Sequence, residues 1–302
     1  FLTILLILSY LVLLISVLVS VAFYTLLERS VLGYIQIRKG PNSVGVIGLL
    51  QPFSDGLKLM VSEQVFPIFS NKVVFYLSPI FGLFLSLSYW SLYDLLGSGF
   101  FIESGIIYFL VLSSLGVYSL LGAGWGSNSI YSVLGCYRAV AQTISYEVSL
   151  ALILLGVVML VGDYNFLSNW NFSMVKMGLL FLLLWVWVLS SLAETNRSPF
   201  DFAEGESELV SGFNIEYGAG GFALIFIAEY ANIILISLLT CYLFFPLSLP
   251  LGVMFFMFIF LWVRGSFPRY RYDKLMGLAW KGILPFVLGY YLFLYGILIL
   301  CN

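Results

Sequence analysis

The residues best suited to chemistry are the acidic side chains of segment 194–217. Six carboxylates fall within 23 residues there, accompanied by one arginine, Arg197. When like charges lie close together in a partly dehydrated site, their pKa values rise and they exchange protons near neutral pH. The segment therefore predicts a proton-exchanging site, with a solvated acidic loop as the alternative. Its acids are Glu194, Asp201, Glu204, Glu206, Glu208 and Glu216.

The local sequence also predicts how some of these acids are arranged. Ser198 and Pro199 are typical of a helix start, with serine at the N-cap and proline at the first helical position. A helix that begins there carries Asp201, Glu204 and Glu208 on one face. Aromatic residues interleave with the acids, and apolar segments flank the loop directly, so we expect the loop to fold back against them.

Two further acids lie inside apolar segments. Glu147 follows Arg138 by nine residues, which is about 13 Å along a helix axis. Glu229 lies about 20 Å beyond Glu216 by the same rise. A carboxylate inside a membrane is costly and usually belongs to a proton or ion pathway, although a neutral, hydrogen-bonded structural glutamate is the alternative at each position. Polar neighbours accompany both acids: Gln142, Thr143, Ser145, Tyr146 and Ser149 near the first, and Tyr230 and Asn232 near the second.

Segment 28–72 offers a different chemistry. It begins with Glu28 and Arg29, which close the first apolar segment, and continues through Arg38 to a sharp turn. Farther on, apolar and polar residues alternate with helical spacing, which predicts a short amphipathic helix lying in a membrane interface. This helix either connects elements at the membrane surface or lines a ligand site. Its apolar face is Phe53, Leu57, Met60 and Val61, and its polar face is Asp55, Lys58 and Ser62.

The composition of the chain decides which solvent surrounds these groups. Of 302 residues, 62% are hydrophobic and only 9% are charged. Soluble domains carry about a quarter charged residues, so most of this surface must face lipid. Soluble enzymes, nucleic-acid binders and disordered proteins are thereby excluded. Because the chain has no histidine and only three cysteines, we expect it to bind no metal and no redox cofactor of its own.

Eight segments are apolar and long enough to cross a membrane as helices. We therefore expect an all-α, polytopic membrane protein, with residues 1–302 forming a single transmembrane domain of about eight transmembrane helices and short amphipathic interfacial helices. No cationic stretch precedes the first span, so we do not expect a cleaved signal, and the lack of an initiator Met predicts that a few residues precede Phe1. The expected spans are 2–27, 74–95, 105–124, 139–162, 177–194, 218–244, 249–265 and 276–300.

Charge placement predicts the orientation of these spans. Eleven of the 13 cations fall in loops on one side, and by the positive-inside rule those loops face the cytoplasm or the mitochondrial matrix. Twelve of the 15 acids lie on the same side. Two loops dominate this face: the first inner-side loop, 28–72, and the acidic inner-side loop, 194–217. Between the last two spans, segment 267–274 alternates cations with aromatic residues, which favours contact with lipid headgroups or a partner subunit.

Four stretches of the chain resemble one known family. Residues 193–217 are similar to the signature loop of the H-type, chain 1 family of quinone-site membrane subunits of respiratory complex I, NADH–ubiquinone oxidoreductase. Residues 28–42, 138–149 and 267–276 match the same family. The resemblance covers essentially the whole chain, and the animal mitochondrial type is the most similar.

The resemblance implies a subunit that forms the ubiquinone-access tunnel and couples quinone reduction to proton translocation. It implies a multi-pass protein of the mitochondrial inner membrane whose charged loops face the matrix. Ubiquinone is then the substrate, whereas NADH, FMN and iron–sulfur clusters belong to partner subunits in the hydrophilic arm. Neighbouring membrane-arm subunits and membrane lipid are the other expected partners, and no nucleic acid is expected.

The resemblance also implies roles for individual residues. The charged part of the tunnel is expected to be lined by Glu28, Arg29, Arg38 and Asp55, and its apolar wall by Phe222 and Phe226. The proton relay is expected to comprise Glu147, Glu194, Asp201, Glu204, Glu206, Glu208 and Glu229, with Arg197 balancing charge. Reduction of quinone is expected to shift the pKa values of the acidic loop, so that protons or loop motion pass through Glu147 and Glu229.

Two other classes of function stay open at this point. A stand-alone proton- or cation-coupled membrane transporter also places acids inside the membrane, although the chain lacks the internal repeat that is common in such folds. A purely structural anchor for the hydrophilic arm leaves Glu147 and Glu229 unexplained. We expect a subunit of a proton-translocating oxidoreductase that couples the reaction and carries no redox centre.

Overall fold

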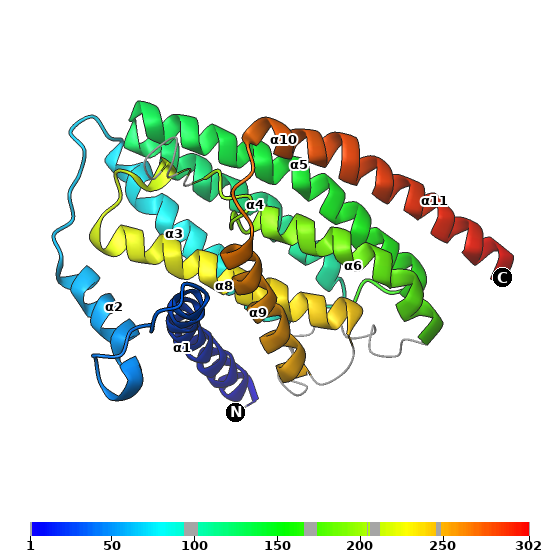
Figure 1. The fold of residues 1–302 in the computed structure, drawn as a ribbon, viewed down its shortest axis with the longest axis horizontal. Coiled ribbons are helices and arrows are strands. Elements are labelled where there is room, and N and C mark those ends of the chain that lie inside the picture. The colour runs from blue at the N-terminus through cyan, green and yellow to red at the C-terminus, as the bar shows by residue number, and fades with distance from the viewer. Residues whose placement is uncertain are drawn as a thin grey trace.

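The computed structural model describes residues 2–93, 102–165, 174–203, 205, 212–245 and 249–301. Within these ranges every regular element is a helix, and the long helices lie side by side in a bundle (Figure 1). The predicted all-α fold is therefore confirmed. The α-helices are α1 (Leu2–Ile35), α2 (Gln51–Val61), α3 (Lys72–Ser88), α4 (Gly105–Ser127), α5 (Ile130–Val161), α6 (Met174–Glu194), α8 (Ala219–Phe244), α9 (Leu249–Ser266), α10 (Tyr272–Gly277) and α11 (Leu284–Cys301). The short elements are η1 (Val46–Gly48), η2 (Tyr89–Leu92), η4 (Gly212–Asn214) and the π-helical η5 (Leu278–Ile283).

Each of the eight expected spans has a helical counterpart. In the described part of the chain, seven helices are long and apolar enough to cross a membrane, and α6 contributes a shorter apolar stretch, Gly178–Glu194. The last span joins α10, η5 and α11 into one run, Tyr272–Leu300. The amphipathic helix predicted in the first inner-side loop is α2, and none of its residues is buried.

Two helices extend furthest beyond their predicted bounds. α1 continues past residue 27 to Ile35, because the Glu28 side chain is buried against other helices and is neutralised there by an ion pair. The helix ends in a turn where Ile37 has a φ of 57°. α5 begins at Ile130 and not at residue 139, and its additional turns are tightly packed. A side chain at Gly135 would come within 2.9 Å of the backbone of η4.

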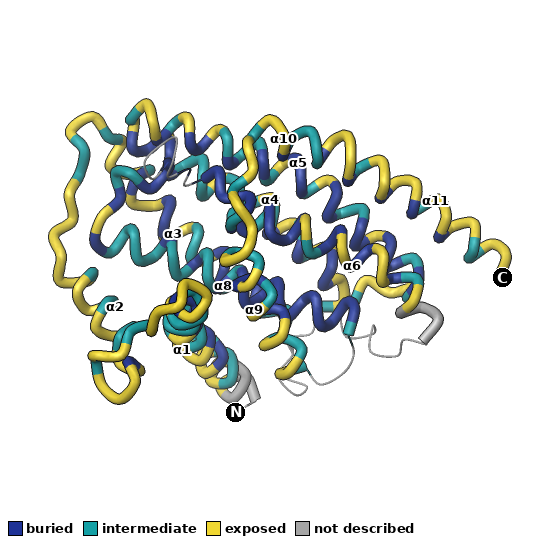
Figure 2. The backbone as a smooth tube through the Cα atoms, in the orientation of Figure 1, coloured by how far each residue is buried: buried dark blue, intermediate teal, exposed yellow. Residues whose placement is uncertain are grey.

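α5 and α8 form the centre of the bundle. α5 packs against α4, α6 and α11, and α8 packs against α1, α3 and α9. In Figure 2 the dark-blue buried residues follow these central helices, whereas α2 and α11 are largely exposed. Because the exposed residues of the long helices are mostly apolar, the outside of the bundle suits lipid contact.

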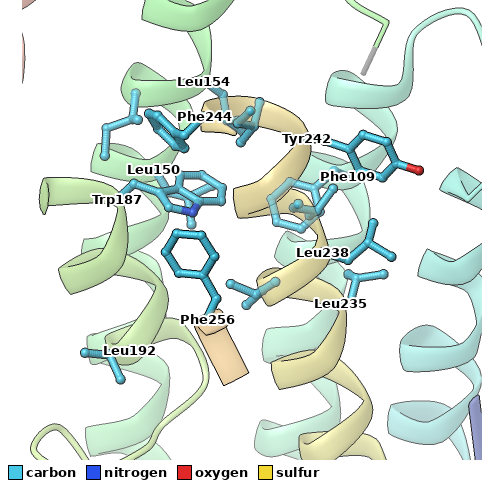
Figure 3. Close-up of a cluster of buried hydrophobic side chains, with 14 of the residues drawn as sticks. Phe109, Leu150, Leu154, Trp187, Leu192, Leu235, Leu238, Tyr242, Phe244 and Phe256 are labelled. Carbon is cyan, nitrogen blue, oxygen red and sulfur yellow. The ribbon is translucent and has the colours of Figure 1, made fainter. Parts of the chain in front are cut away.

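The main apolar core lies between α5, α6 and α8 (Figure 3). Trp187 of α6 is fully buried, and its ring centroid lies 6.2 Å from that of Phe244 of α8. Leu150 and Leu154 of α5 and Phe256 of α9 complete the cluster in the close-up. This close packing fixes the relative positions of the helices whose polar ends form the site described next.

Candidate functional site

A polar cavity of about 120 Å³ lies between α3, α4, α5, α8 and the end of α6. Three carboxylates from three different helices line it: Glu147 of α5, Glu194 of α6 and Glu229 of α8. Glu147 accepts a hydrogen bond from the Ser113 hydroxyl of α4, with an O–O distance of 3.5 Å. The structure thus brings both acids predicted inside apolar segments together with the first acid of the acidic loop. We call this site the carboxylate cavity.

Several oxygen atoms in the carboxylate cavity are available to further hydrogen-bonding groups. Glu194 Oε2, Asn196 Oδ1 and Asn232 Oδ1 are buried and have no hydrogen-bond partner among the described residues, and all three residues line the cavity. A polar cavity of this volume has the room and the partners that ordered water molecules require. Acids inside a membrane usually belong to a proton or ion pathway.

A smaller cavity of about 20 Å³ adjoins the carboxylate cavity. It shares Glu194 and Asn232 with the larger cavity, and it is bounded by Tyr89, Phe109 and Leu235. Its volume suits about one water molecule. Near Glu194 and Asn232 the carboxylate cavity is therefore followed by a smaller space, and aromatic and aliphatic side chains form part of its lining.

Arg197 contacts two residues of α8, one of which lines the carboxylate cavity. A guanidinium nitrogen of Arg197 is 3.7 Å from a carboxylate oxygen of Glu229. The guanidinium carbon is 4.3 Å from the centroid of the Tyr230 ring. A planar, delocalised cation suits both contacts, since it pairs with a carboxylate while it stacks on an aromatic face. The predicted charge-balancing residue therefore lies beside one of the predicted relay acids.

Glu28 lies at the far end of the same set of contacts. Its side chain is buried, forms an ion pair with Arg264 of α9, and accepts a hydrogen bond from the Tyr230 hydroxyl. Contacts therefore continue from α9 and α1, through α8, to the carboxylate cavity. We call this the Glu28–Glu229 path, and its members in order are Arg264, Glu28, Tyr230, Arg197 and Glu229.

The first inner-side loop brings only some of its predicted residues together. Arg29 of α1 forms an ion pair with Asp55 of α2 at 2.5 Å, and Gln51 donates a second hydrogen bond to the same carboxylate at 2.9 Å. Arg38 is exposed and donates a hydrogen bond to Gln36 in its own turn. The structure thus joins α1 to α2 through one predicted pair and leaves Arg38 apart from it.

The two predicted apolar-wall residues lie in the first part of α8, where Phe222 packs against the cluster that contains Phe75 and Tyr217. Phe222 and Phe226 are partly buried, and their ring centroids are 4.4 Å apart. α8 packs against both α1 and α2, and Phe23 of α1 contacts Phe53 of α2 edge to face. Aromatic rings therefore lie on α1, α2 and α8, and α8 also carries Tyr230 and Glu229 of the Glu28–Glu229 path.

The predicted helix start at Ser198 and Pro199 is wrong for the described residues, because 199–203 form turns. The Pro199 carbonyl accepts a hydrogen bond from the Tyr270 amide, and the Ala203 carbonyl accepts one from the Phe213 amide. The side-chain amide of Gln142 on α5 donates to the Phe200 carbonyl of this segment and to the Ala193 carbonyl at the end of α6, at 2.8 Å each. These long-range partners satisfy the backbone in place of helical hydrogen bonds.

Asp201 is held by the segment between the last two spans. Arg269 forms an ion pair with Asp201 at 2.9 Å, and Tyr270 and Tyr272 contact the rings of Phe200 and Phe202. Segment 267–274, which the sequence assigned to lipid headgroups or a partner subunit, thus holds part of the acidic loop of its own chain. The predicted relay residues Glu204, Glu206 and Glu208 lie outside the described residues.

Sequence reasoning did not assign a role to three residues of these sites: Tyr230 and Arg264 of the Glu28–Glu229 path, and Asn232 of the carboxylate cavity. Tyr230 and Asn232 stood out only as polar neighbours of Glu229, and Arg264 was counted, without being singled out, among the eleven cations on one side of the membrane. One signal could have found Arg264: a buried acid at the end of one span needs a cation at the same depth, and Arg264 ends another span on the same side.

The cysteines and acids offer no metal-binding cluster in the described part of the chain. No group of three or more Cys, Asp or Glu side chains is arranged there to hold a metal ion. Cys136 and Cys241 are buried, unpaired thiols, and each packs closely against a glycine, Gly124 and Gly252 respectively. Both cysteines act as small packing residues between helices.

Comparison with known proteins gives one consistent family. Residues 8–295 match the profile of the family described as NADH dehydrogenase. The chain is 55% identical over 297 residues to "NADH-ubiquinone oxidoreductase chain 1" of Aedes aegypti, covering 95% of this chain and 94% of the relative. Identity to the protein of the same name from Anopheles gambiae is 56% over 294 residues, covering 95% and 94%. Identity to that from Locusta migratoria is 53% over 304 residues, covering 96% and 95%.

Proposed function

The chain belongs to the NADH dehydrogenase family, as a multi-pass membrane subunit of mitochondrial complex I, and from this membership we propose that it lines a quinone tunnel and relays protons. As an oxidoreductase subunit of the inner membrane, it has other complex I subunits as partners. The comparisons do not favour the alternative of a stand-alone transporter. Two regions of the structure support the two proposed roles.

The proposed quinone tunnel runs between α1, α2 and α8. Ubiquinone has a polar head and an apolar isoprenoid tail, so its tunnel needs charged groups at one part and apolar rings at another. The contacts of α1, α2 and α8 support this arrangement. In our proposal the charged part comprises Glu28, Arg29, Arg38 and Asp55, and the apolar wall comprises Phe222 and Phe226. Electrons reach the quinone from FMN and iron–sulfur clusters in partner subunits, which oxidise NADH.

The proposed proton relay is centred on the carboxylate cavity. Glu147, Glu194 and Glu229 share this cavity, and we include Asp201 of the acidic loop, which pairs with Arg269. We include Glu204, Glu206 and Glu208 in the relay on the strength of the motif alone. The single observation that carries the proposal is the Glu28–Glu229 path, because it connects the proposed tunnel to the proposed relay by direct contacts.

The charges along this path suggest how coupling would work. Glu28 is shared between Arg264 and the Tyr230 hydroxyl. A change of charge or protonation near Glu28 alters the hydrogen bond to Tyr230, whose ring carries the Arg197 guanidinium. Arg197 is also the partner of Glu229, so a shift of Arg197 changes how strongly that carboxylate holds a proton. Such effects are stronger between mostly buried groups than at a surface in water.

We also propose the placement of the subunit in the complex. The cation-rich loops face the matrix, in accordance with the positive-inside rule, and the hydrophilic-arm subunits dock there. The first inner-side loop supports this docking, since it exposes several large apolar residues at the same face as the charged groups. Residues 1–302 act as a single transmembrane unit with two inner-side loops, 28–72 and 194–217. The exposed apolar residues include Ile37, Val46, Ile47 and Ile68.

The relay is tested by neutralising its acids in the intact complex. We expect Glu147→Gln, Glu229→Gln and Glu204→Gln to lower proton translocation per quinone reduced by at least about tenfold, since an intramembrane relay fails when one carrier no longer titrates. Quinone reductase activity and proton uptake are measured together in reconstituted vesicles. Glu103→Gln is the matched control, because Glu103 is exposed near the other end of the spans. Full, tightly coupled activity in the three variants would refute the relay.

A further inference from the structure

Segment 267–274, which joins α9 to α10 (Figure 1), contacts the acidic loop in three different ways. Arg269 forms an ion pair with Asp201 at 2.9 Å. The Tyr270 amide donates to the Pro199 carbonyl at 3.1 Å. Two pairs of aromatic rings, with centroids 5.6 Å and 6.0 Å apart, complete the contact: Tyr270 with Phe200, and Tyr272 with Phe202.

The residues held in this way belong to the turn that begins at Arg197. The Phe200 amide donates to the Arg197 carbonyl at 2.8 Å, which closes a turn over residues 197–200. α5 holds the same turn, because the Gln142 side-chain amide donates to the Phe200 carbonyl and the Tyr146 ring lies 6.3 Å from the Phe200 ring. The turn is therefore fixed by α5 and by segment 267–274 together.

Arg197 is fixed on its other side by the end of α6. Its amide donates to the Leu192 carbonyl at 3.3 Å. Its guanidinium lies beside the Glu229 carboxylate and over the Tyr230 ring. Because both ends of this residue's backbone are held, the two contacts of the guanidinium depend on where α6 and the turn place Arg197.

The ion pair is the directional contact between segment 267–274 and the turn. Apolar contact between rings is non-directional and tolerates sliding, whereas a charge-assisted hydrogen bond requires donor and acceptor in definite positions. The side chains of Arg269 and Asp201 are only 26% and 12% exposed. Loss of either partner therefore leaves the other charge largely out of water and without this pairing, which is strongly unfavourable.

We propose that Arg269 is a positioning residue of the relay. Its ion pair with Asp201 fixes turn 197–200, and the turn holds the Arg197 guanidinium beside Glu229. Arg269 acts through the turn, since it is not among the described residues that line the carboxylate cavity. The inference rests on the proposed relay, because the position of Arg197 affects coupling only if Glu229 carries protons.

The position of the turn is tested by amide hydrogen exchange in the intact, purified complex. Peptides that cover residues 193–203 are quantified by mass spectrometry. We expect Arg269→Gln to speed exchange of the turn amides by about tenfold, the equivalent of one hydrogen bond to a charged group. Asp201→Asn should have the same effect, and the double variant should exchange no faster than either single variant, because both changes remove one interaction.

The matched control is Arg271→Gln, in the same segment. Arg271 is exposed, and its ion pair among the described residues is with Asp273. We expect exchange of the turn amides to be unchanged in this variant. Arg269→Lys keeps the charge but loses the planar, forked donor group, so its exchange should lie between that of the wild type and that of Arg269→Gln.

The effect on coupling is measured in the same variants in reconstituted vesicles. We expect Arg269→Gln to lower coupled turnover by about fivefold to tenfold, which does not exceed the effect of Arg197→Gln because α6 still holds Arg197. Arg269→Lys should recover part of this loss. The KM for quinone should stay within about twofold of the wild type, since the ion pair acts on the turn and not on the substrate.

Three results would overturn the proposal. Unchanged exchange of the turn in both Arg269→Gln and Asp201→Asn would show that the ion pair does not fix it. Faster exchange with unchanged coupling, in a complex that Glu229→Gln uncouples, would show that the turn does not control Glu229. A raised KM for quinone with intact coupling would make Arg269 a quinone-binding residue.

The two measurements separate this proposal from the relay itself. If Glu229→Gln leaves coupling intact, the proposed relay fails, and Arg269 cannot position it. If Glu229→Gln uncouples the complex but Arg269→Gln changes neither exchange nor coupling, the relay stands and only the positioning role of Arg269 is refuted.

Discussion

The two halves of α8 differ in what surrounds them. From Ile233 to Phe244 every residue is buried, and this half packs into the apolar core of Figure 3. One turn earlier, Glu229 and Asn232 line the carboxylate cavity, and Tyr230 carries the Arg197 guanidinium. A single helix therefore belongs to a closely packed region along one half and to a polar, partly open region along the other.

This difference assigns separate tasks to the two regions. A close-packed apolar core has little space for water and resists rearrangement, so it keeps the helices in position. The polar region has a cavity and oxygen atoms that can accept further hydrogen bonds, so protons and side chains are able to change position there. Substitutions in the core should change stability and assembly, whereas substitutions in the polar region should change coupling.

The largest effect is expected from Trp187→Ala in the core. Trp187 is fully buried, and removal of a large aromatic side chain from a packed core costs about 3–5 kcal/mol. We expect the amount of assembled complex to fall sharply, as measured by native gels and by thermal inactivation. Trp185→Ala is the matched control, because Trp185 lies on the same helix and is 61% exposed.

A specific outcome would break the comparison. If Trp187→Ala left assembly intact and instead uncoupled proton translocation from quinone reduction, the apolar core would share in the coupling. The assignment of stability to the apolar half of α8 and of coupling to its polar half would then be wrong.

A smaller effect is expected from Arg197→Gln in the polar region. The substitution removes the partner of Glu229 and the cation above the Tyr230 ring. A guanidinium beside a carboxylate changes its proton affinity by about tenfold or more, so we expect coupled turnover to fall by at least about tenfold while the complex still assembles. Arg271→Gln serves as control, since Arg271 is exposed and its ion pair among the described residues is with Asp273, two residues on.

Arg197→Lys sharpens this prediction. Lysine keeps the charge but lacks the planar group that stacks on Tyr230 and pairs with Glu229 at once. We expect coupled turnover between that of the wild type and that of Arg197→Gln. Wild-type turnover in Arg197→Gln would remove Arg197 from the proposed path.

The sequence predicts the apolar spans well, because the pattern that specifies each span lies within the span itself. A run of about 20 apolar residues specifies a span by itself, and each of the eight expected spans has a helix in the structure. The bounds are less accurate where a charged residue ends the apolar run. α1 continues past Glu28 because Arg264, more than 200 residues away in the sequence, neutralises it.

The polar half depends on contacts that no local pattern contains. Glu147, Glu194 and Glu229 could be selected from the sequence as costly acids, but their shared cavity arises only when three helices pack. The turns at 199–203 replaced the predicted helix because the Gln142 and Tyr270 amides bond their carbonyls. Tyr230 carries no charge and gave no signal of its own, although it joins Glu28 to Arg197.

The smallest effect is expected from Tyr230→Phe, which removes one hydroxyl and keeps the ring. The hydrogen bond to Glu28 is lost, while the ring still supports the Arg197 guanidinium. One hydrogen bond to a charged group contributes about 1.5–3 kcal/mol, part of which Arg264 retains by its own pairing with Glu28. We expect the number of protons translocated per quinone reduced to fall by about threefold to tenfold.

The control for Tyr230→Phe is Tyr24→Phe on α1. The Tyr24 ring lies 5.8 Å from the Tyr230 ring, but its hydroxyl donates to the Met257 carbonyl at 3.4 Å and not to Glu28. If hydroxyl loss acts through the Glu28–Glu229 path, only the first variant lowers coupling. If both variants lower it equally, the effect comes from general packing between α1, α8 and α9, and the hydrogen bond to Glu28 is not what connects the two proposed sites.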